Sequence, residues 1–134
     1  MQRKEARALA LELIYEYEFH KDRAPQDFYV DALRLRELPG NDYALRLFLG
    51  VQQHREAMDG LIAQHSKNWS LSRISRVSLA ILRLAVFEMR FDDQVETPIA
   101  INEAVELAKQ YEGEDAYTFI NGVLGGIARE GEHG

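Results

Sequence analysis

The chain has 134 residues, 46% of them hydrophobic, which is the size and composition of one globular domain with a buried core. It has no cysteine and no run of about 18 apolar residues, which excludes disulfides and thiolate metal sites and predicts a cytoplasmic protein without a membrane-spanning helix. Its net charge of −6, taken alone, argues against a nucleic-acid-binding protein, because phosphate binding usually accompanies a basic excess.

The apolar residues recur with a helical period of about 3.6 residues, and no alternating run bounded by turns indicates a strand. The first predicted helix covers residues 3–20 and begins with a basic tip, in which Arg3, Lys4 and Arg7 outweigh Glu5. Its apolar face consists of Ala6, Leu9, Ala10, Leu13, Ile14 and Tyr17. Since the acidic excess of the chain lies entirely in its last third, any RNA site is expected to be small and local.

Two further helices are predicted before the middle of the chain. Pro25 stands at the start of a helix over residues 26–38, which a following Pro-Gly pair ends. Asn41 or the aspartate after it caps a third helix that continues to the middle of the chain. Gly50 and Gly60 are the points at which this long helix is expected to bend or divide.

The most apolar segment of the chain, residues 79–89, predicts a central helix. Ser70 precedes a short helical piece over residues 71–77, and Ser78 is the N-cap candidate for the central helix.

Two helices are predicted after the central one. Thr97 and Pro98 begin a helix that ends before Gly113, where a C-terminal stop is expected. Asp115 caps the last helix, residues 116–129. The class is therefore all-α, with six to seven helices.

Catalytic and metal chemistry find little support in the sequence. The histidines are scattered, and His54 and His65 would lie roughly 16 Å apart on one helix, too far for one metal ion. The glycines of residues 121–126 lack the preceding strand and the Gly-Lys-Ser/Thr of a phosphate loop, and indicate close helix packing instead. The acids of residues 112–115 suit a helix start through the helix dipole alone. We therefore expect no catalytic residue, no metal and no cofactor.

Three features admit both a structural and a binding interpretation. Arg76, Arg83 and Arg90 recur every seven residues, so a solvated stripe is favoured over a surface for RNA or an acidic partner. Most aromatic residues stand at helical spacing and are expected in the core, although an exposed one could stack on a base. Asn102 and Asn121 occupy apolar segments, where buried amides that lock helix ends are favoured over ligand contacts.

Ordered motifs along almost the whole chain resemble the NusB family. They are ARALALELIYEYE, LFLGV, MDGLIAQHSKNWSLSRISRVSLAILRLAVFEM, PIAINEAVELAK and GEDAYTFINGVLGGIA. The resemblance implies two small helical bundles packed orthogonally, with residues 1–134 forming a single RNA-binding domain that catalyses no reaction. It also implies a role in transcription antitermination during ribosomal RNA synthesis. The expected partners are NusE, a small-subunit ribosomal protein, the single-stranded boxA element of nascent RNA, and the transcription elongation complex with other Nus factors.

The resemblance also implies functional residues. The family's N-terminal arginine-rich motif corresponds to Arg3, Lys4 and Arg7, which are expected to contact RNA. A second RNA-facing patch corresponds to Asp115, Thr118, Phe119 and Asn121, with Phe119 as the stacking candidate. The NusE contact corresponds to Tyr15, Phe19 and Ser78.

Two other interpretations remain open at this point. The chain could be the NusB-like module of a ribosomal RNA cytosine methyltransferase, although it contains neither a Gly-rich cofactor-binding unit nor a catalytic cysteine. It could also form a homodimer that hides the RNA surface.

Overall fold

The computed structural model describes residues 1–67 and 70–133 and is helical throughout these ranges, with short connections. Its elements are α1 (Arg3–Tyr17), α2 (Pro25–Leu35), α3 (Asp42–Gln53), α4 (Arg55–His65), the 3-10 helix η1 (Leu71–Arg73), α5 (Arg76–Arg90), α6 (Thr97–Tyr111) and α7 (Glu114–His133). The described residues form no strand, and the prediction of an all-α fold with six to seven helices is confirmed by seven α-helices.

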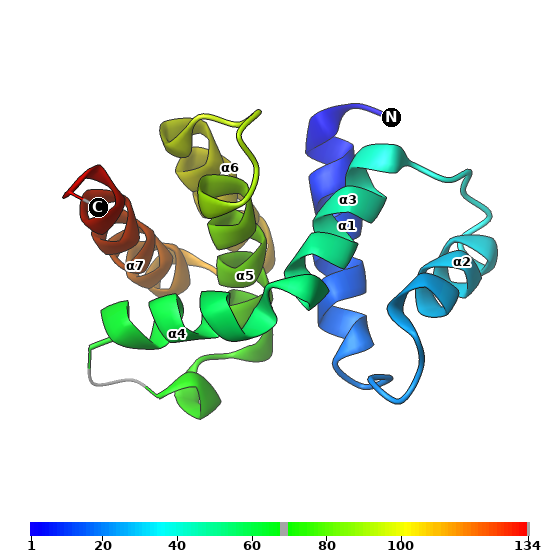
Figure 1. Ribbon diagram of the computed structural model, residues 1–134, viewed down its shortest axis with the longest axis horizontal. Helices are drawn as coiled ribbons and strands as arrows, with labels where there is room; N and C mark the ends of the chain where they lie inside the picture. The colour runs from blue at the N-terminus through cyan, green and yellow to red at the C-terminus, as the bar shows by residue number, and fades with distance from the viewer. Residues whose placement is uncertain (68–69, 134) are drawn as a thin grey trace.

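The helices form two bundles (Figure 1). Helices α1, α2 and α3 make the first bundle, which carries the N-terminus, and α4 to α7 make the second, which carries the C-terminus. Helix α5 packs against α1 and α3 as well as against its own bundle. The predicted arrangement in two small bundles is confirmed, and α5 is the helix that both bundles share.

The core follows the apolar periodicity of the sequence. Every residue on the predicted apolar face of the first helix is buried. In α5, every residue from Ala80 to Glu88 is buried. Burying apolar area at about 25 cal/mol per Å² is the main favourable term for such a fold. The central position predicted for this helix is therefore confirmed.

The long third helix that was predicted is divided into α3 and α4, but the break lies at neither Gly50 nor Gly60. The chain leaves helical geometry at His54, where φ is −110° and ψ is 18°, and this residue both ends α3 and precedes α4. The His54 ring stacks on Phe91 with a centroid distance of 4.1 Å. Gly50 instead allows α3 to approach α5, since a Cβ there would lie 2.2 Å from a ring carbon of Phe87.

Helix starts account for most other differences from the predicted elements. Ser75, not Ser78, caps α5, because its hydroxyl accepts a hydrogen bond from the Ser78 amide at 3.0 Å. Asn41 caps α3 as predicted, accepting from the Ala44 amide at 2.9 Å. Helix α7 begins at Glu114, so Asp115 lies in its first turn and is not its cap.

Helix ends differ as well. The first two helices are shorter than predicted and end at Tyr17 and Leu35. Gly113 follows α6 as predicted, with φ of +130°, a left-handed conformation that favours glycine.

An ionic cluster around the buried Arg83 ties α5 to α4 and to the end of α1. Arg83 is 4% exposed and binds both carboxylate oxygens of Asp59, at 2.8 and 3.0 Å. It also donates to Glu18 at 3.1 Å, and Arg55 binds Glu18 through two nitrogens. The two carboxylates pair the charge of Arg83, and a buried charge must be paired if it is not to destabilise the fold.

This cluster predicts acid sensitivity. Burial alone would raise the pKa of Glu18, but the hydrogen bond from Arg55 and the charges of Arg55 and Arg83 lower it below its ordinary value of 4.5. As the pH falls, the Glu18 carboxylate is therefore protonated at a higher pH in the unfolded chain than in the folded chain. The stabilisation is fully present above 4.5 and is lost as pH falls through the lowered pKa of the folded state.

We expect the free energy of unfolding to decrease as the pH falls below 4.5. In the Glu18→Gln variant this decrease should be smaller, because the variant has no carboxyl group to protonate at this position. The difference in stability between the two proteins should be largest at neutral pH and shrink in acid. Urea unfolding at a series of pH values measures it. Parallel pH profiles for the two proteins would contradict the lowered pKa.

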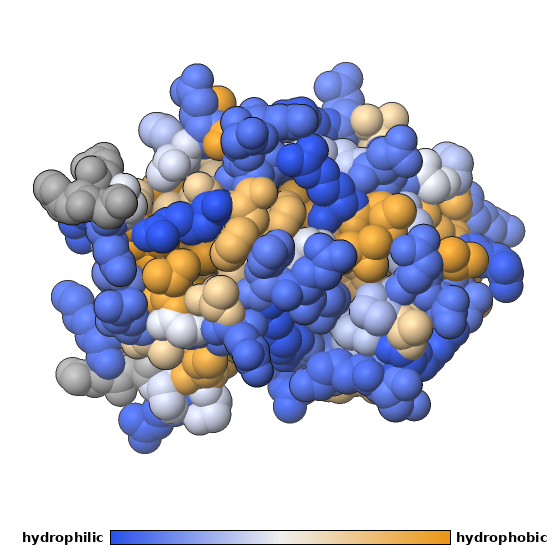
Figure 2. All heavy atoms as spheres, in the orientation of Figure 1, coloured by the Kyte–Doolittle hydropathy of each residue, from blue (hydrophilic) through white to orange (hydrophobic). Residues whose placement is uncertain are grey.

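Polar side chains cover most of the face drawn in Figure 1, with smaller apolar areas between them (Figure 2). The exposed apolar residues are spread over several elements and include Phe19, Val30, Leu35, Phe91, Ile99 and Tyr111. Among the described residues no helix is both long and apolar enough to cross a membrane.

Candidate nucleic-acid interface

The basic tip lies at the start of α1. Arg3 and Lys4 are exposed, and the Arg3 guanidinium lies over the ring of Tyr43 on α3, with Cζ 4.6 Å from the ring centroid. The Lys4 ammonium is 3.7 Å from a carboxylate oxygen of Glu103 on α6, yet its side chain is 71% exposed. An ion pair with so exposed a lysine is weak, so phosphate can compete with Glu103 for Lys4.

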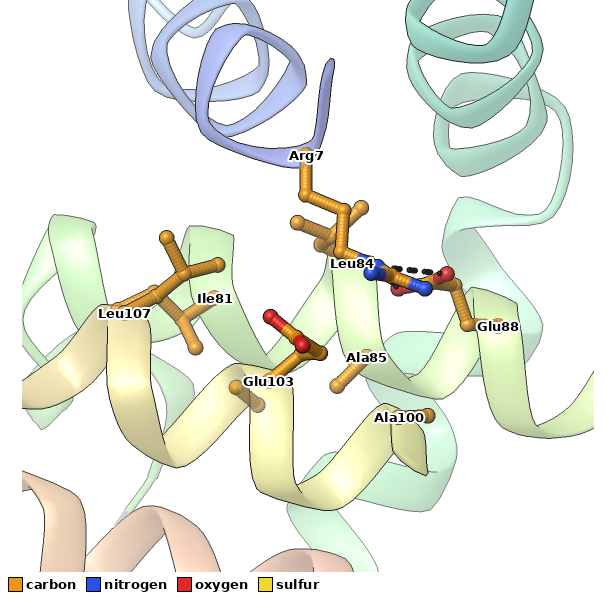
Figure 3. A pocket seen from close by; sticks show the side chains of 9 residues that line it. Arg7, Ile81, Leu84, Ala85, Glu88, Ala100, Glu103 and Leu107 are labelled. Atoms are coloured by element: carbon orange, nitrogen blue, oxygen red, sulfur yellow. Dashed lines mark hydrogen bonds and ion pairs between the residues drawn. The ribbon is translucent and has the colours of Figure 1, made fainter. Parts of the chain in front are cut away.

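Arg7, the third cation predicted for the tip, is buried. It is 5% exposed, and its Nε lies 3.0 Å from each carboxylate oxygen of Glu88 on α5. Figure 3 shows Arg7 reaching from α1 toward Glu88, with Glu103 of α6 facing the same space. The exposed basic tip therefore does not include Arg7. The reason is that Arg7 lies one helical turn after Arg3, where α5 and α6 pack against α1.

Glu88 is the centre of a buried polar network. The Tyr43 hydroxyl donates to Glu88 at 2.5 Å, so one carboxylate on α5 binds side chains of both α1 and α3. Burial and the hydrogen bond to Glu88 raise the pKa of Tyr43, which keeps its hydroxyl protonated. Burial would lower the pKa of Arg7, but the hydrogen bond and charge of Glu88 outweigh it and raise that pKa. The network thus holds the start of α1 against α3.

The predicted RNA patch on α7 is divided between two sides of that helix. Asp115 and Phe119 are four residues apart and share one side, as the helical repeat requires. They line a pocket with Arg73, Ile74, Ser75, Ser78, Glu112 and Ala116. Asp115 is exposed and Phe119 is partly buried against the core.

The other two residues of the patch line a groove between α6 and α7. Thr118 and Asn121 are both exposed, and the Thr118 hydroxyl donates to the Glu114 carbonyl at 3.1 Å. The groove is completed by Thr97, Pro98, Ile101, Asn102, Val105, Tyr117 and Ala128. Tyr117, which lines this groove, has the Nζ of Lys109 5.1 Å from its ring centroid.

The prediction that the side-chain amides of two asparagines are buried is wrong. Asn102 and Asn121 are exposed, so neither is the buried amide that locks a helix end. Both line the groove between α6 and α7. Their apolar sequence neighbours face the core, while the amides lie on the opposite side of each helix.

The residues predicted to bind a protein partner lie at the opposite end of α1 from the basic tip. Tyr15 and Phe19 form an edge-to-face pair with ring centroids 5.5 Å apart, and Phe19 is 53% exposed. Arg76, at the start of α5, holds its Cζ 5.0 Å from the Phe19 ring centroid. Only the tertiary fold brings this arginine to the pair.

Ser78 is 5% exposed, so it is a poor contact for a large partner. Its hydroxyl is 3.5 Å from a carboxylate oxygen of Glu112, which also accepts a hydrogen bond from Ser75. Ser78 lines the same pocket as Asp115 and Phe119. One residue predicted for the partner therefore lies beside two residues predicted for RNA, while Tyr15 and Phe19 are not among the residues that line this pocket.

The predicted solvated stripe of arginines on the central helix is interrupted in its middle, because Arg76 and Arg90 are exposed and Arg83 is buried. Arg83 is buried in the ionic cluster with Asp59 and Glu18, since α5 is covered along most of its length. Arg90 donates to the Ile127 carbonyl of α7 at 3.0 Å. Arg76 alone of the three arginines lies beside an exposed aromatic residue proposed to bind a partner.

Within the part of the chain that the structure describes, no group of three or more His, Cys, Asp or Glu side chains is placed to hold a metal ion. His65 of α4 pairs with Glu130 of α7, and His54 stacks on Phe91. The polar clusters described above are ion pairs and hydrogen bonds between helices.

The two-bundle helical fold, with its small basic tip, is that of the helical transcription antitermination proteins. A family model described as the NusB family matches residues 4–129, and the chain belongs to that family. Transcription antitermination protein NusB of Acetivibrio thermocellus is 46% identical over 131 residues, which cover 96% of this chain and 90% of the relative.

Solved structures agree with this assignment. A crystal structure of the antitermination factors NusB and NusE in complex with double-stranded RNA matches with a TM-score of 0.83 and 28% identity, covering 96% of both chains. A crystal structure of NusB from T. maritima matches with a TM-score of 0.82 and 29% identity, covering 97% of this chain and 92% of the other. NusB proteins are antitermination factors, and the chain is accordingly not an enzyme.

Proposed function

We propose that this chain is a transcription antitermination factor that pairs with NusE and binds the boxA element of nascent ribosomal RNA. The observation that carries the proposal is its similarity, over 96% of both chains, to a NusB that was solved together with NusE and RNA. The chain would act in the cytoplasm as one RNA-binding domain over residues 1–134, within an elongation complex that contains other Nus factors.

The proposed RNA contacts fall into two groups. Arg3 and Lys4 bind phosphates, because both are exposed and cationic. Arg7 is proposed to support them from beneath, held by its ion pair with Glu88. On α7, Phe119 stacks on a base, while Asp115, Thr118 and Asn121 offer hydrogen bonds to base edges.

The proposed NusE surface is the aromatic pair Tyr15 and Phe19, together with the start of α5. An exposed phenyl ring beside a guanidinium provides both apolar area and a charge for a protein partner. Ser78 is buried at this place, so its effect on NusE would act through Ser75 and Glu112.

The number of exposed cations indicates why a partner is needed. Two phosphate contacts to single-stranded RNA predict a slope of log K against log salt of only about −1.4. One stacked aromatic adds about 1–3 kcal/mol. The chain alone should therefore bind RNA weakly, and tight binding should require NusE.

A titration of boxA-type RNA tests the proposal. We expect weak binding by the chain alone and much tighter binding in an equimolar mixture with NusE, with a scrambled RNA as control. Equal affinity with and without NusE, or no preference for boxA, would refute the proposed function. Mass in solution should be measured in the same samples, because a homodimer that dissociates on adding NusE would explain weak binding by the free chain.

A further inference from the structure

Helix α3 begins beside the basic tip of α1. The Tyr43 ring lies under the Arg3 guanidinium, with Cζ 4.6 Å from the ring centroid, and the Tyr43 hydroxyl binds the carboxylate that also holds Arg7. Arg7 itself lies with its Cζ 5.8 Å from the same ring. The first turns of α1 and α3 are therefore held together at several points, and side chains of α3 can take part in whatever the tip binds.

Arg46 is an exposed cation on α3, about one helical turn after Tyr43. It follows Tyr43 by three residues, so the two side chains lie on the same side of α3. Its Nη2 donates to Asp92 at 2.8 Å, and Asp92 is oriented in turn by the amide of Gln94 at 2.9 Å. The side chain of Asp92 is 0% exposed and that of Arg46 is 39% exposed. The carboxylate thus lies on the buried side of the pair, and the positive end faces solvent.

We propose that Arg46 and Tyr43 belong to the RNA-binding surface, with Arg46 binding a phosphate and Tyr43 positioning Arg3. The proposal rests on the proposed function of the chain as an RNA-binding factor. Since Arg7 is buried, the exposed tip keeps only two of its three predicted cations, and Arg46 supplies the third from a different helix. An arginine suits this role because its planar guanidinium can bind Asp92 by one edge and phosphate by another.

Anchoring also favours binding. Arg3 rests on an aromatic face and Arg46 on a buried carboxylate, so neither side chain is as mobile as a free surface arginine. Ordering a mobile side chain on binding costs conformational entropy, and much of this cost is already met in the free protein.

The experiment measures boxA-type RNA binding, in the presence of NusE, as a function of salt concentration. Arg46→Gln should weaken binding at low salt and make the slope of log K against log salt less steep by about 0.7, the effect of one phosphate contact. Arg34→Gln is the matched control, since this arginine lies on α2 in the same bundle with its side chain 75% exposed. It should leave affinity and slope unchanged.

Further variants separate charge from folding. Arg46→Lys keeps the charge and should keep the slope, even where the bond to Asp92 is weakened. Tyr43→Phe keeps the ring beneath Arg3 and should retain RNA binding, whereas Tyr43→Leu removes the ring and should weaken it. Thermal unfolding of each variant, followed by circular dichroism, defines the temperature range in which the binding is measured.

Arg3→Gln and Lys4→Gln distinguish failure of this inference from failure of the proposed function. Loss of binding in these two variants with no change in Arg46→Gln would overturn the assignment of α3 and leave the function standing. If none of the tip variants changed RNA binding, the basic tip would not be an RNA-binding surface.

Discussion

Replacing Glu88 by alanine should lower the free energy of unfolding by about 3–5 kcal/mol, the usual cost of removing one partner from a buried ion pair. Glu88 is 1% exposed and accepts hydrogen bonds from Arg7 and Tyr43. Its removal leaves the Arg7 guanidinium buried without a counter-charge. Urea unfolding at neutral pH measures the loss. Such a loss is large against the total stability of a small domain, which is about 5–15 kcal/mol.

Two comparisons show whether the buried charge is the cause. Glu106→Ala removes a glutamate whose ion pair with Lys109 is about half exposed, and it should change stability by no more than about 0.5 kcal/mol. The double variant Arg7→Met with Glu88→Met removes both charges while keeping volume, and should recover most of the loss. A double variant as unstable as Glu88→Ala would show that the side-chain packing matters and the charge does not.

Gly50→Ala should destabilise the protein by about 1–3 kcal/mol, although alanine is normally the better residue inside a helix. The added Cβ would lie 2.2 and 2.3 Å from two ring carbons of Phe87, so α3 and α5 would have to move apart or the ring would have to turn. Denaturant unfolding measures the change. The effect is expected to be large because α3 and α5 belong to different bundles and meet at this point.

Gly60→Ala is the matched control on α4. A Cβ at Gly60 meets nothing within 4 Å, so this substitution should stabilise the protein by up to about 1 kcal/mol through helix propensity alone. In a Phe87→Ala background, Gly50→Ala should lose its penalty because the ring is gone. A Gly50→Ala protein as stable as the parent would contradict the close contact between the two helices.

Both predictions concern α5, and both bear on the RNA surface. Glu88 binds side chains of α1 and α3, the two helices whose first turns carry Arg3 and Tyr43. Loosening that network should therefore disturb the basic tip as well as the fold.

Local sequence was sufficient for the helices themselves. The apolar period of α1 and α5 predicted their buried faces, and Asn41 predicted the start of α3, because propensity and capping act over a few neighbouring residues. The break at His54 was missed because it depends on how α3 and α4 pack on α5, where His54 stacks on Phe91.

The candidate site was predicted less completely. The motif with Asp115 and Phe119 was found, but its division from Thr118 and Asn121 follows from which neighbouring helix covers each side of α7. Arg76 beside Phe19 was missed as well, because the two residues are distant in the sequence and only the contact between α1 and α5 joins them.

The sequence by itself determined an all-helical chain of the NusB family and placed cations at its N-terminus. Helical period, caps and family motifs are local properties, and a short segment contains all the information they need. Only the tertiary structure decided which cations face solvent. Arg7 is buried in its ion pair with Glu88, 81 residues later in the chain, while Arg46 stays exposed beside the buried Asp92. Burial and pairing depend on groups from several helices, and charge in the sequence does not specify them.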